Sequence, residues 1–141
     1  MSTGPSQKIA SATHLQAESV PDTDHMRRWL TSNAVVAADG STFSWSNPSH
    51  QGYPYPEAAG LLLSTLSTTP DVGEESRAVA DRIASWLCRC IGADGGVGRD
   101  GITYLFDSSV ALAGLLRYRA AGGREGGDDP IHRLAAFVGA C

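Results

Sequence analysis

Apolar side chains recur every three or four residues along much of this chain, a spacing that predicts helices with one buried face. The pattern is clearest between residues 74 and 91, where one face would carry Val79, Ile83, Trp86, Leu87 and Cys90. Polar or glycine-rich stretches separate the apolar segments. An all-α fold is therefore expected, with about five helices over residues 24–37, 56–68, 74–91, 107–121 and 130–138.

Residues that favour helix ends stand at the borders of these segments. Asp39-Gly40 would end the first helix, because glycine readily adopts the left-handed conformation of a helix C-cap. Pro56 suits the first turn of the second helix, where its missing N–H costs nothing. Glu57 would then lie beside unpaired N–H groups at the positive end of the helix dipole. Asp107 or Ser108 would cap the fourth helix.

The apolar segments form two units of similar sequence, each with two helices. Trp29-Leu30 and Asp39-Gly40 precede one helix rich in Ala, Gly and Leu, and Trp86-Leu87 and Asp94-Gly95 precede a second such helix. Self-similarity at a period of roughly 50 residues predicts tandem helical hairpins. We expect residues 1–21 to be a flexible leader and residues 22–141 to be one hairpin-repeat domain. Its units would span residues 24–70 and 74–123, with an incomplete third unit at 129–141.

The two helices of each unit differ in character. The second is small or aliphatic on most sides, as in "AAGLLL" and "ALAGLL", and is expected to be buried nearly all round. The first carries more charge and is expected to lie outside. Alternating outer and inner helices predict an open α-hairpin solenoid or a partial α/α toroid.

Two stretches carry a resemblance to a known group: "YPYPEAAGLLLSTL" and "WLCRCIGADGGVGRDGITYLFDSSVALAGLL". They resemble α/α-toroid proteins related to N-acylglucosamine 2-epimerases, terpene cyclases and prenyltransferases, and most of all bacterial toroid proteins of polysaccharide or natural-product biosynthesis. In that group a tyrosine-proline-glutamate turn opens one inner helix, and a phenylalanine-aspartate pair opens the next. The resemblance covers roughly residues 26–123 and implies a toroid-type biosynthetic domain.

The chain departs from that group in size, because a full toroid has about six hairpins and only about two are present here. Three explanations stay open: a fragment, a ring completed by another chain, or a shortened open solenoid. An open array exposes its inner faces, so we expect self-association or a partner chain that completes the toroid.

The composition of the chain indicates which classes of partner it can bind and where in the cell it is located. Apolar residues make up 42% of the chain, enough for a core, and the net charge of −4 argues against nucleic-acid binding. No apolar run approaches a membrane span of about 20 residues, and residues 1–20 lack the apolar core of a secretory signal. A cytoplasmic location is expected, with Cys88, Cys90 and Cys141 as reduced thiols.

Glu57 and Asp107 are the candidate catalytic residues, each at the start of an inner helix, where both would face one mouth. Such a pair suits general acid–base chemistry or the binding of sugar hydroxyls; stabilisation of the helix N-termini is the alternative. Aromatic side chains nearby suit stacking on a sugar or an isoprenoid cation, with hairpin packing as the alternative. The candidate substrate-binding residues are Trp45, His50, Tyr53, Tyr55, Asp94 and Tyr104.

No cofactor or metal is expected. The loop over residues 92–101 is rich in glycine but lacks the Gly-Lys-Ser/Thr ending of a phosphate loop, so a turn is expected. Cys88 and Cys90 would point about 200° apart on a helix and could not readily share one metal ion. Three functions stay open: action on a carbohydrate or related intermediate, a non-catalytic accessory subunit that binds a partner, and a terpene cyclase or prenyltransferase relative.

Overall fold

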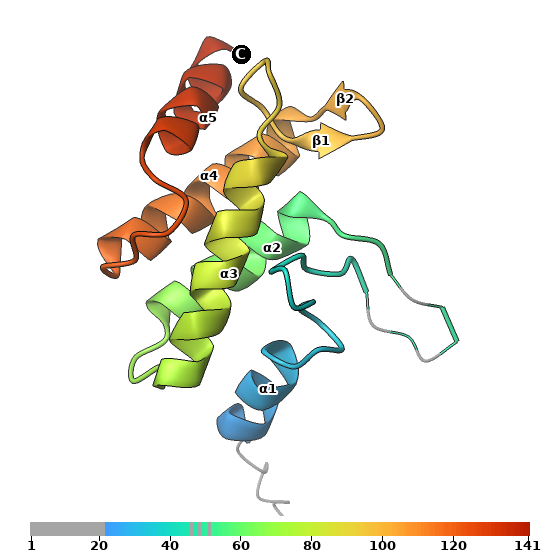
Figure 1. Cartoon of the computed structure of the whole chain (residues 1–141), viewed down its shortest axis with the longest axis vertical. Coiled ribbons are helices and arrows are strands. Elements are labelled where there is room, and N and C mark those ends of the chain that lie inside the picture. Colours follow the sequence, from blue (N-terminus) through green and yellow to red (C-terminus); the bar gives the residue numbers. More distant parts are fainter. Residues whose placement is uncertain (1–21, 46, 48, 51) are drawn as a thin grey trace, which may run out of the picture.

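The computed structural model describes residues 22–141 except for 46, 48 and 51. Within that part the chain forms five helices and one short β-hairpin, so the all-α prediction is confirmed (Figure 1). The expected leader, residues 1–21, lies outside the described residues. None of the helices in the described part is both long and apolar enough to cross a bilayer.

Helix α1, Thr23–Leu30, is shorter than the sequence predicted. Asp22 caps it, accepting a hydrogen bond from the His25 N–H at 2.9 Å. The expected continuation to residue 37 is wrong, because Ser32 turns its hydroxyl back to the Trp29 carbonyl at 2.7 Å and the following residues form turns. Val36 then pairs with Thr42 in an isolated β-bridge.

The Asp39-Gly40 turn packs directly on helix α3, Glu74–Cys90. Gly40 has φ +90°, and a Cβ there would lie 2.1 Å from the Arg82 carbonyl oxygen. Only glycine meets both the backbone conformation and the space available. The turn therefore lies within a loop, between the bridge partners Val36 and Thr42, and not at the end of a helix; it fixes the segment before α2 against the core.

Helices α2, Pro56–Thr68, and α4, Leu105–Ala120, form the centre of the fold and run parallel. Their contacts advance together along both helices, from Tyr55 with Asp107, through Gly60 with Gly114, to Ser64 with Arg117. A Cβ at Gly114 would lie 2.5 Å from the Gly60 carbonyl oxygen. The two glycines thus let the backbones touch, so the small-residue helices pack side by side.

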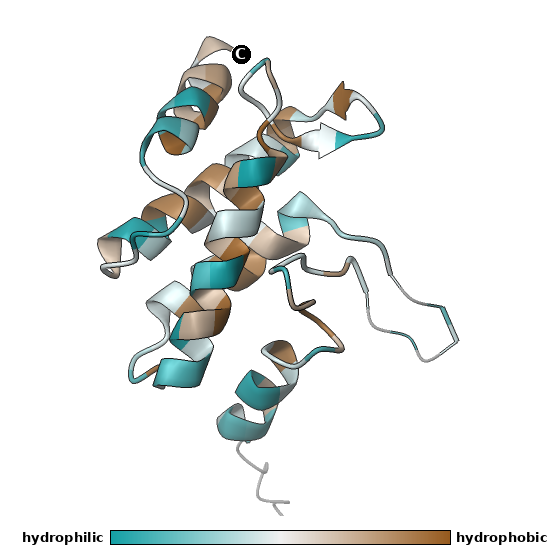
Figure 2. Cartoon of the chain, in the orientation of Figure 1, coloured by the Kyte–Doolittle hydropathy of each residue, from teal (hydrophilic) through white to brown (hydrophobic). Residues whose placement is uncertain are grey.

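Helix α3 crosses this pair (Figure 1) and supplies the apolar face that its spacing predicted. Val79, Ile83 and Leu87 are buried, while Glu74, Glu75, Arg77 and Arg89 are exposed and Asp81 and Arg82 are half-buried. Figure 2 shows hydrophilic and hydrophobic residues alternating along α3. Helix α5, Asp129–Ala140, packs on α4 and buries Ile131 and Leu134. The core therefore lies between α3 and the α2–α4 pair, with α5 extending it along α4.

The loop before α4 contains a hairpin that the sequence reasoning missed. Strands β1, Gly98–Arg99, and β2, Ile102–Thr103, pair antiparallel around Asp100 and Gly101. Both turn residues have positive φ, 54° and 78°, as a type I′ turn requires. The Asp-Gly dipeptide is the sequence signal for such a turn.

The small-residue helices are not buried all round, contrary to the prediction. Leu61 of α2 and Phe106 and Leu116 of α4 are each more than half exposed. Helix α3 covers one side of the pair and α5 covers one flank of α4, and no other helix or strand of the described residues packs extensively on the opposite side of the two helices.

Candidate functional site

The N-terminal ends of α2 and α4 lie at one rim of the molecule. Tyr55 precedes α2 and Tyr104 precedes α4, both in extended backbone. The Tyr55 N–H donates to the Thr42 carbonyl at 2.9 Å, and the Tyr104 N–H donates to the Val97 carbonyl at 3.1 Å. The two loops before these helices therefore hold both tyrosines, and in Figure 1 both loops extend from the same side of the helix pair.

Asp107 is buried at this rim, with 4% of its surface exposed. Its Oδ1 accepts a hydrogen bond from the Tyr55 hydroxyl at 3.4 Å, and its Oδ2 has no partner among the described residues. Burial raises the pKa of Asp107, the Tyr55 hydrogen bond lowers it in part, and the charge of Glu57 raises it further. The carboxyl group thus holds its proton to a higher pH than a solvent-exposed aspartate.

Tyr55 joins the two candidate carboxylates. Burial raises its pKa to about 12, and the negative charges of the neighbouring Glu57 and Asp107 add to that shift. Its hydroxyl therefore stays protonated at neutral pH and serves as a donor. The predicted pair, Glu57 and Asp107, lies at one rim with this tyrosine between them.

Neither carboxylate is an N-cap, so the predicted capping by Asp107 or Ser108 is wrong. Helix α4 begins two residues before Asp107, and Tyr104 occupies the N-cap. Asp107 is the third helical residue and Glu57 the second, positions about 100° apart around a helix. This difference explains why Asp107 points into the contact with α2 while Glu57 is only half-buried. Ser108 instead bonds through its hydroxyl to the Val97 N–H at 3.0 Å and so ties the glycine loop to α4.

An aromatic ladder extends from Tyr55 to the surface. Tyr55 and Tyr53 meet edge-on with ring centroids 5.7 Å apart, and Tyr53 and Trp45 meet in the same way at 5.1 Å. The Trp45 indole N–H donates to the His50 carbonyl at 3.2 Å, which holds the ring in the loop. Trp45 is about half exposed. The structure therefore brings three of the predicted binding residues, Tyr55, Tyr53 and Trp45, into one row, which His50 contacts through its backbone carbonyl.

Arg99 was not predicted at this site. Its guanidinium lies 3.8 Å from the centre of the Tyr53 ring, a cation–π contact made from the β-hairpin. The residues are far apart in sequence, and the Asp100-Gly101 turn that aims Arg99 was not recognised, so the contact could not be derived from spacing. The hairpin thus places Arg99 on the aromatic row, where its guanidinium also pairs with Asp100 at 3.1 Å.

Asp94 and Tyr104 have different surroundings. Asp94 holds its own loop, accepting hydrogen bonds from the Thr103 hydroxyl at 2.6 Å and from the Gly96 N–H at 3.2 Å. These bonds lower its pKa, with the Thr103 bond as the largest cause. Both carboxylate oxygens are thus engaged within the chain. Tyr104 is 44% exposed, so its ring is accessible at the rim.

The cysteines do not form a metal centre, and across the described residues no cluster of three His, Cys, Asp or Glu side chains could hold an ion. Cys88 and Cys90 are partly buried free thiols, and Cys141 is exposed. Burial raises the pKa of Cys90 to about 11 and that of Cys88 in the same direction. Both α3 thiols are therefore protonated and poorly nucleophilic at neutral pH.

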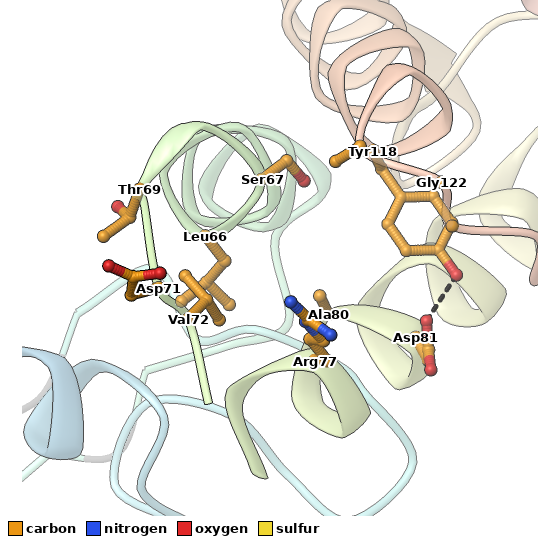
Figure 3. Close-up of a pocket in the computed structure, with 12 residues that line it drawn as sticks. Leu66, Ser67, Thr69, Asp71, Val72, Arg77, Ala80, Asp81, Tyr118 and Gly122 are labelled. Atoms are coloured by element: carbon orange, nitrogen blue, oxygen red, sulfur yellow. Dashed lines mark hydrogen bonds between the residues drawn. The ribbon is translucent and has the colours of Figure 1, made fainter. Parts of the chain in front are cut away.

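A cleft of about 370 Å³ lies at the opposite end of the helix pair, where α2 and α4 end (Figure 3). Arg77 points into it, with Asp71 and Asp81 on either side. The Tyr118 hydroxyl donates to Asp81 at 2.5 Å and accepts from the Glu125 N–H at 3.1 Å. The Tyr118 hydroxyl therefore links α4 to Asp81 of α3 and to the segment that follows α4, which makes this end of the cleft a structural joint between the two helices.

The rim at Tyr55 is the better candidate site, because it combines a buried ionisable group with an unpaired oxygen, a second carboxylate and accessible aromatic rings. Perturbed carboxyl groups of this kind are typical of functional sites. Comparisons of the chain with models of protein families, with curated proteins and with solved structures found no match.

Proposed function

We propose that this chain is a toroid-type helical module of a biosynthetic protein, and that it binds a carbohydrate or a related polyhydroxylated intermediate at the rim of α2 and α4. Glu57 and Tyr55 would contact ligand hydroxyl groups, and Trp45 and Tyr53 would stack on the ligand's C–H face. The toroid resemblance and a cytoplasmic location belong to the same proposal.

The observation that supports it is that the carboxyl group of Asp107 is buried and that one of its oxygens has no hydrogen-bond partner among the described residues. A buried carboxylate with one unpaired oxygen costs a protein about 1–3 kcal/mol compared with a satisfied or apolar side chain. An apolar side chain would fill the same place between α2 and α4 without that cost. Stability given up in this way is typical of functional sites, where a group is kept for its chemistry.

The surroundings of Asp107 fit hydroxyl-rich ligands. Half-buried Glu57 offers oxygen acceptors, and the Tyr55 hydroxyl, whose proton is donated to Asp107, offers a further acceptor oxygen that does not ionise at neutral pH. Ligand sites of this kind combine a few fixed polar groups with aromatic surface, and the ladder from Tyr55 to Trp45 supplies that surface.

The same pair suits catalysis. Its raised pKa makes Asp107 a better proton donor near neutral pH than a free aspartate, and Glu57 would accept a proton as the second member. Protonation of a leaving oxygen by Asp107 would first require its buried carboxyl to become accessible to the ligand. Ligand binding is therefore the primary proposal, and acid–base catalysis by the same residues is the secondary one.

Titration with a panel of neutral mono- and oligosaccharides, followed by two-dimensional NMR of the tryptophan indole N–H groups, tests this proposal. A ligand should shift the Trp45 signal, and Glu57→Gln should weaken binding at least tenfold. Glu75→Gln is the matched control, since Glu75 is likewise the second residue of its helix but lies on α3. A panel that leaves the Trp45 signal in place, or a Glu57→Gln variant that binds as wild type does, would refute the proposal.

The other two functions make different predictions in the same titration. A terpene cyclase or prenyltransferase relative would respond to isoprenoid compounds through the aromatic rings and not to sugars. A non-catalytic accessory module would respond to neither, and the exposed leucines of α2 and α4 favour it as the second candidate.

A further inference from the structure

The open side of the α2–α4 pair carries an apolar stripe. On α4 it consists of Phe106, Ala113, Leu116 and Ala120, which recur at helical spacing and are all exposed. Leu61 of α2 continues it across the helix crossing. Phe106, Leu61 and Leu116 are 65%, 55% and 51% exposed, so three large apolar side chains gather on one side of two adjacent helices. We call these five residues the open face; clustered apolar surface of this kind marks an interaction site.

The charges bordering the open face are arranged with opposite signs at its two ends. Glu57 is the only charged residue of α2 and lies at the N-terminal end. Arg117 lies toward the C-terminal end of α4, where its guanidinium donates to the Ser64 hydroxyl and so sits between the two helices. The other charged residues of α4 point elsewhere: Asp107 is buried, and Arg119 pairs with Asp128 at 3.3 Å, on the α5 side.

We propose that a second copy of this chain docks on the open face in an antiparallel, two-fold arrangement. A two-fold axis lying in the plane of the face and perpendicular to both helices, level with Leu61 and Ala113, would place the acidic end of each copy on the basic end of the other. Each dimer would then contain two Glu57–Arg117 pairs around a shared apolar centre. A face that is apolar in the middle and carries opposite charges at its ends is self-complementary under this symmetry.

The helix dipoles favour the same orientation. Because α2 and α4 run parallel, their N-terminal ends together present positive partial charge at one end of the face and negative partial charge at the other. An antiparallel copy brings unlike ends together, whereas a parallel copy would bring like ends together.

The size of the open face indicates how strongly two copies should associate. A helix of 16 residues is about 24 Å long, and two neighbouring helices cover a width of about 18 Å. The projected face is therefore about 400 Å², which is small beside the roughly 800 Å² of accessible surface that each partner buries in a standard interface. We expect a weak, reversible dimer.

Sedimentation velocity on the full chain, from 1 µM to 500 µM, tests this proposal. Wild type should move from the mass of one chain to that of two as concentration rises. Leu61→Glu should stay monomeric, with Phe106→Ser as a second variant should Leu61→Glu lose its helical circular dichroism. A wild type that stays monomeric over the whole range would overturn the proposal.

A charge exchange distinguishes the antiparallel pairing from other contacts on the same face. Glu57→Arg and Arg117→Glu should each weaken the dimer at least tenfold, and the double variant should recover it. The matched control Glu75→Arg, on α3, should dimerise as wild type does. Single variants that dimerise normally, or a double variant that stays as weak as the singles, would overturn the antiparallel arrangement. Because Arg117 is not part of the proposed sugar site, monomeric Arg117→Glu should still bind ligand, so the two proposals can fail separately.

Discussion

Replacing Gly60 with alanine should destabilise the protein, although alanine is ordinarily the better helix former. Gly60 lies where α2 crosses α4, and a Cβ there would meet the Val110 carbonyl oxygen at 2.8 Å and the Ala111 Cα at 2.9 Å. These are backbone atoms of a packed helix, so they cannot move aside as the end of a flexible side chain could. The two helices would have to separate.

Two opposing terms set the magnitude. Alanine in place of a mid-helix glycine favours folding by about 0.5–1 kcal/mol. Overpacking a tight core contact costs about 1–3 kcal/mol, and a gap of about 0.5–1 Å loses a quarter to a half of the dispersion attraction between facing atoms. Because α2 packs on α4 more extensively than on any other element, the second term should win. We expect a net loss of about 1–2 kcal/mol.

Urea denaturation followed by circular dichroism at 222 nm measures this loss directly. Gly139→Ala is the matched control, because Gly139 also lies within a helix but a Cβ there meets no atom within 4 Å. That variant should keep or slightly raise the unfolding free energy. If Gly60→Ala shifted the urea midpoint as Gly139→Ala does, the close crossing of α2 and α4 would be refuted.

Three further predictions follow from buried polar groups. Asp107→Asn should raise the free energy of unfolding at pH 7 by about 1 kcal/mol. In wild type the folded state holds the Asp107 carboxyl proton more tightly than the unfolded chain does, so the free energy of unfolding falls as pH rises through the raised pKa. Urea titrations at different pH should show this fall in wild type and not in the variant. Tyr118→Phe should cost about 1–2 kcal/mol in the same assay, because it removes the hydrogen bond to Asp81 and orphans the Glu125 N–H. Iodoacetamide at pH 8 should modify exposed Cys141 first and the α3 thiols only on unfolding, as peptide mass spectrometry would show; early labelling of Cys90 would contradict its raised pKa.

Helix positions that depend on local pattern could be predicted from the sequence. The second helix was predicted correctly at both ends, because Pro56 fixes its start and Pro70 follows its end. The third and fifth agreed within two residues for the same kind of reason. The predicted length of the first helix was wrong for two reasons. The hydroxyls of Thr31 and Ser32 donate hydrogen bonds to carbonyl groups of the preceding turn, and Val36 pairs with Thr42 in a β-bridge that only the tertiary structure supplies.

The site was predictable in its members but not in its geometry. Tyr55, Glu57 and Asp107 were all named from their places before the inner helices, and the structure brings them to one rim. Which carboxylate is buried depends on a one-residue difference in helix start, and that start was placed two residues too late on α4. Arg99 required the hairpin register, which depends on the turn at Asp100-Gly101.

The central claim is that α2 and α4 bring Glu57 and Asp107 to one rim around Tyr55. A carboxyl-carbon NMR titration of Asp107 in wild type, Glu57→Gln and Glu75→Gln measures it most directly. We predict that Asp107 titrates above its ordinary value of 3.8 in wild type, that Glu57→Gln lowers this pKa by removing a nearby negative charge, and that Glu75→Gln leaves it unchanged. An Asp107 that titrates at its ordinary value, or one that responds alike to both substitutions, would contradict the claim.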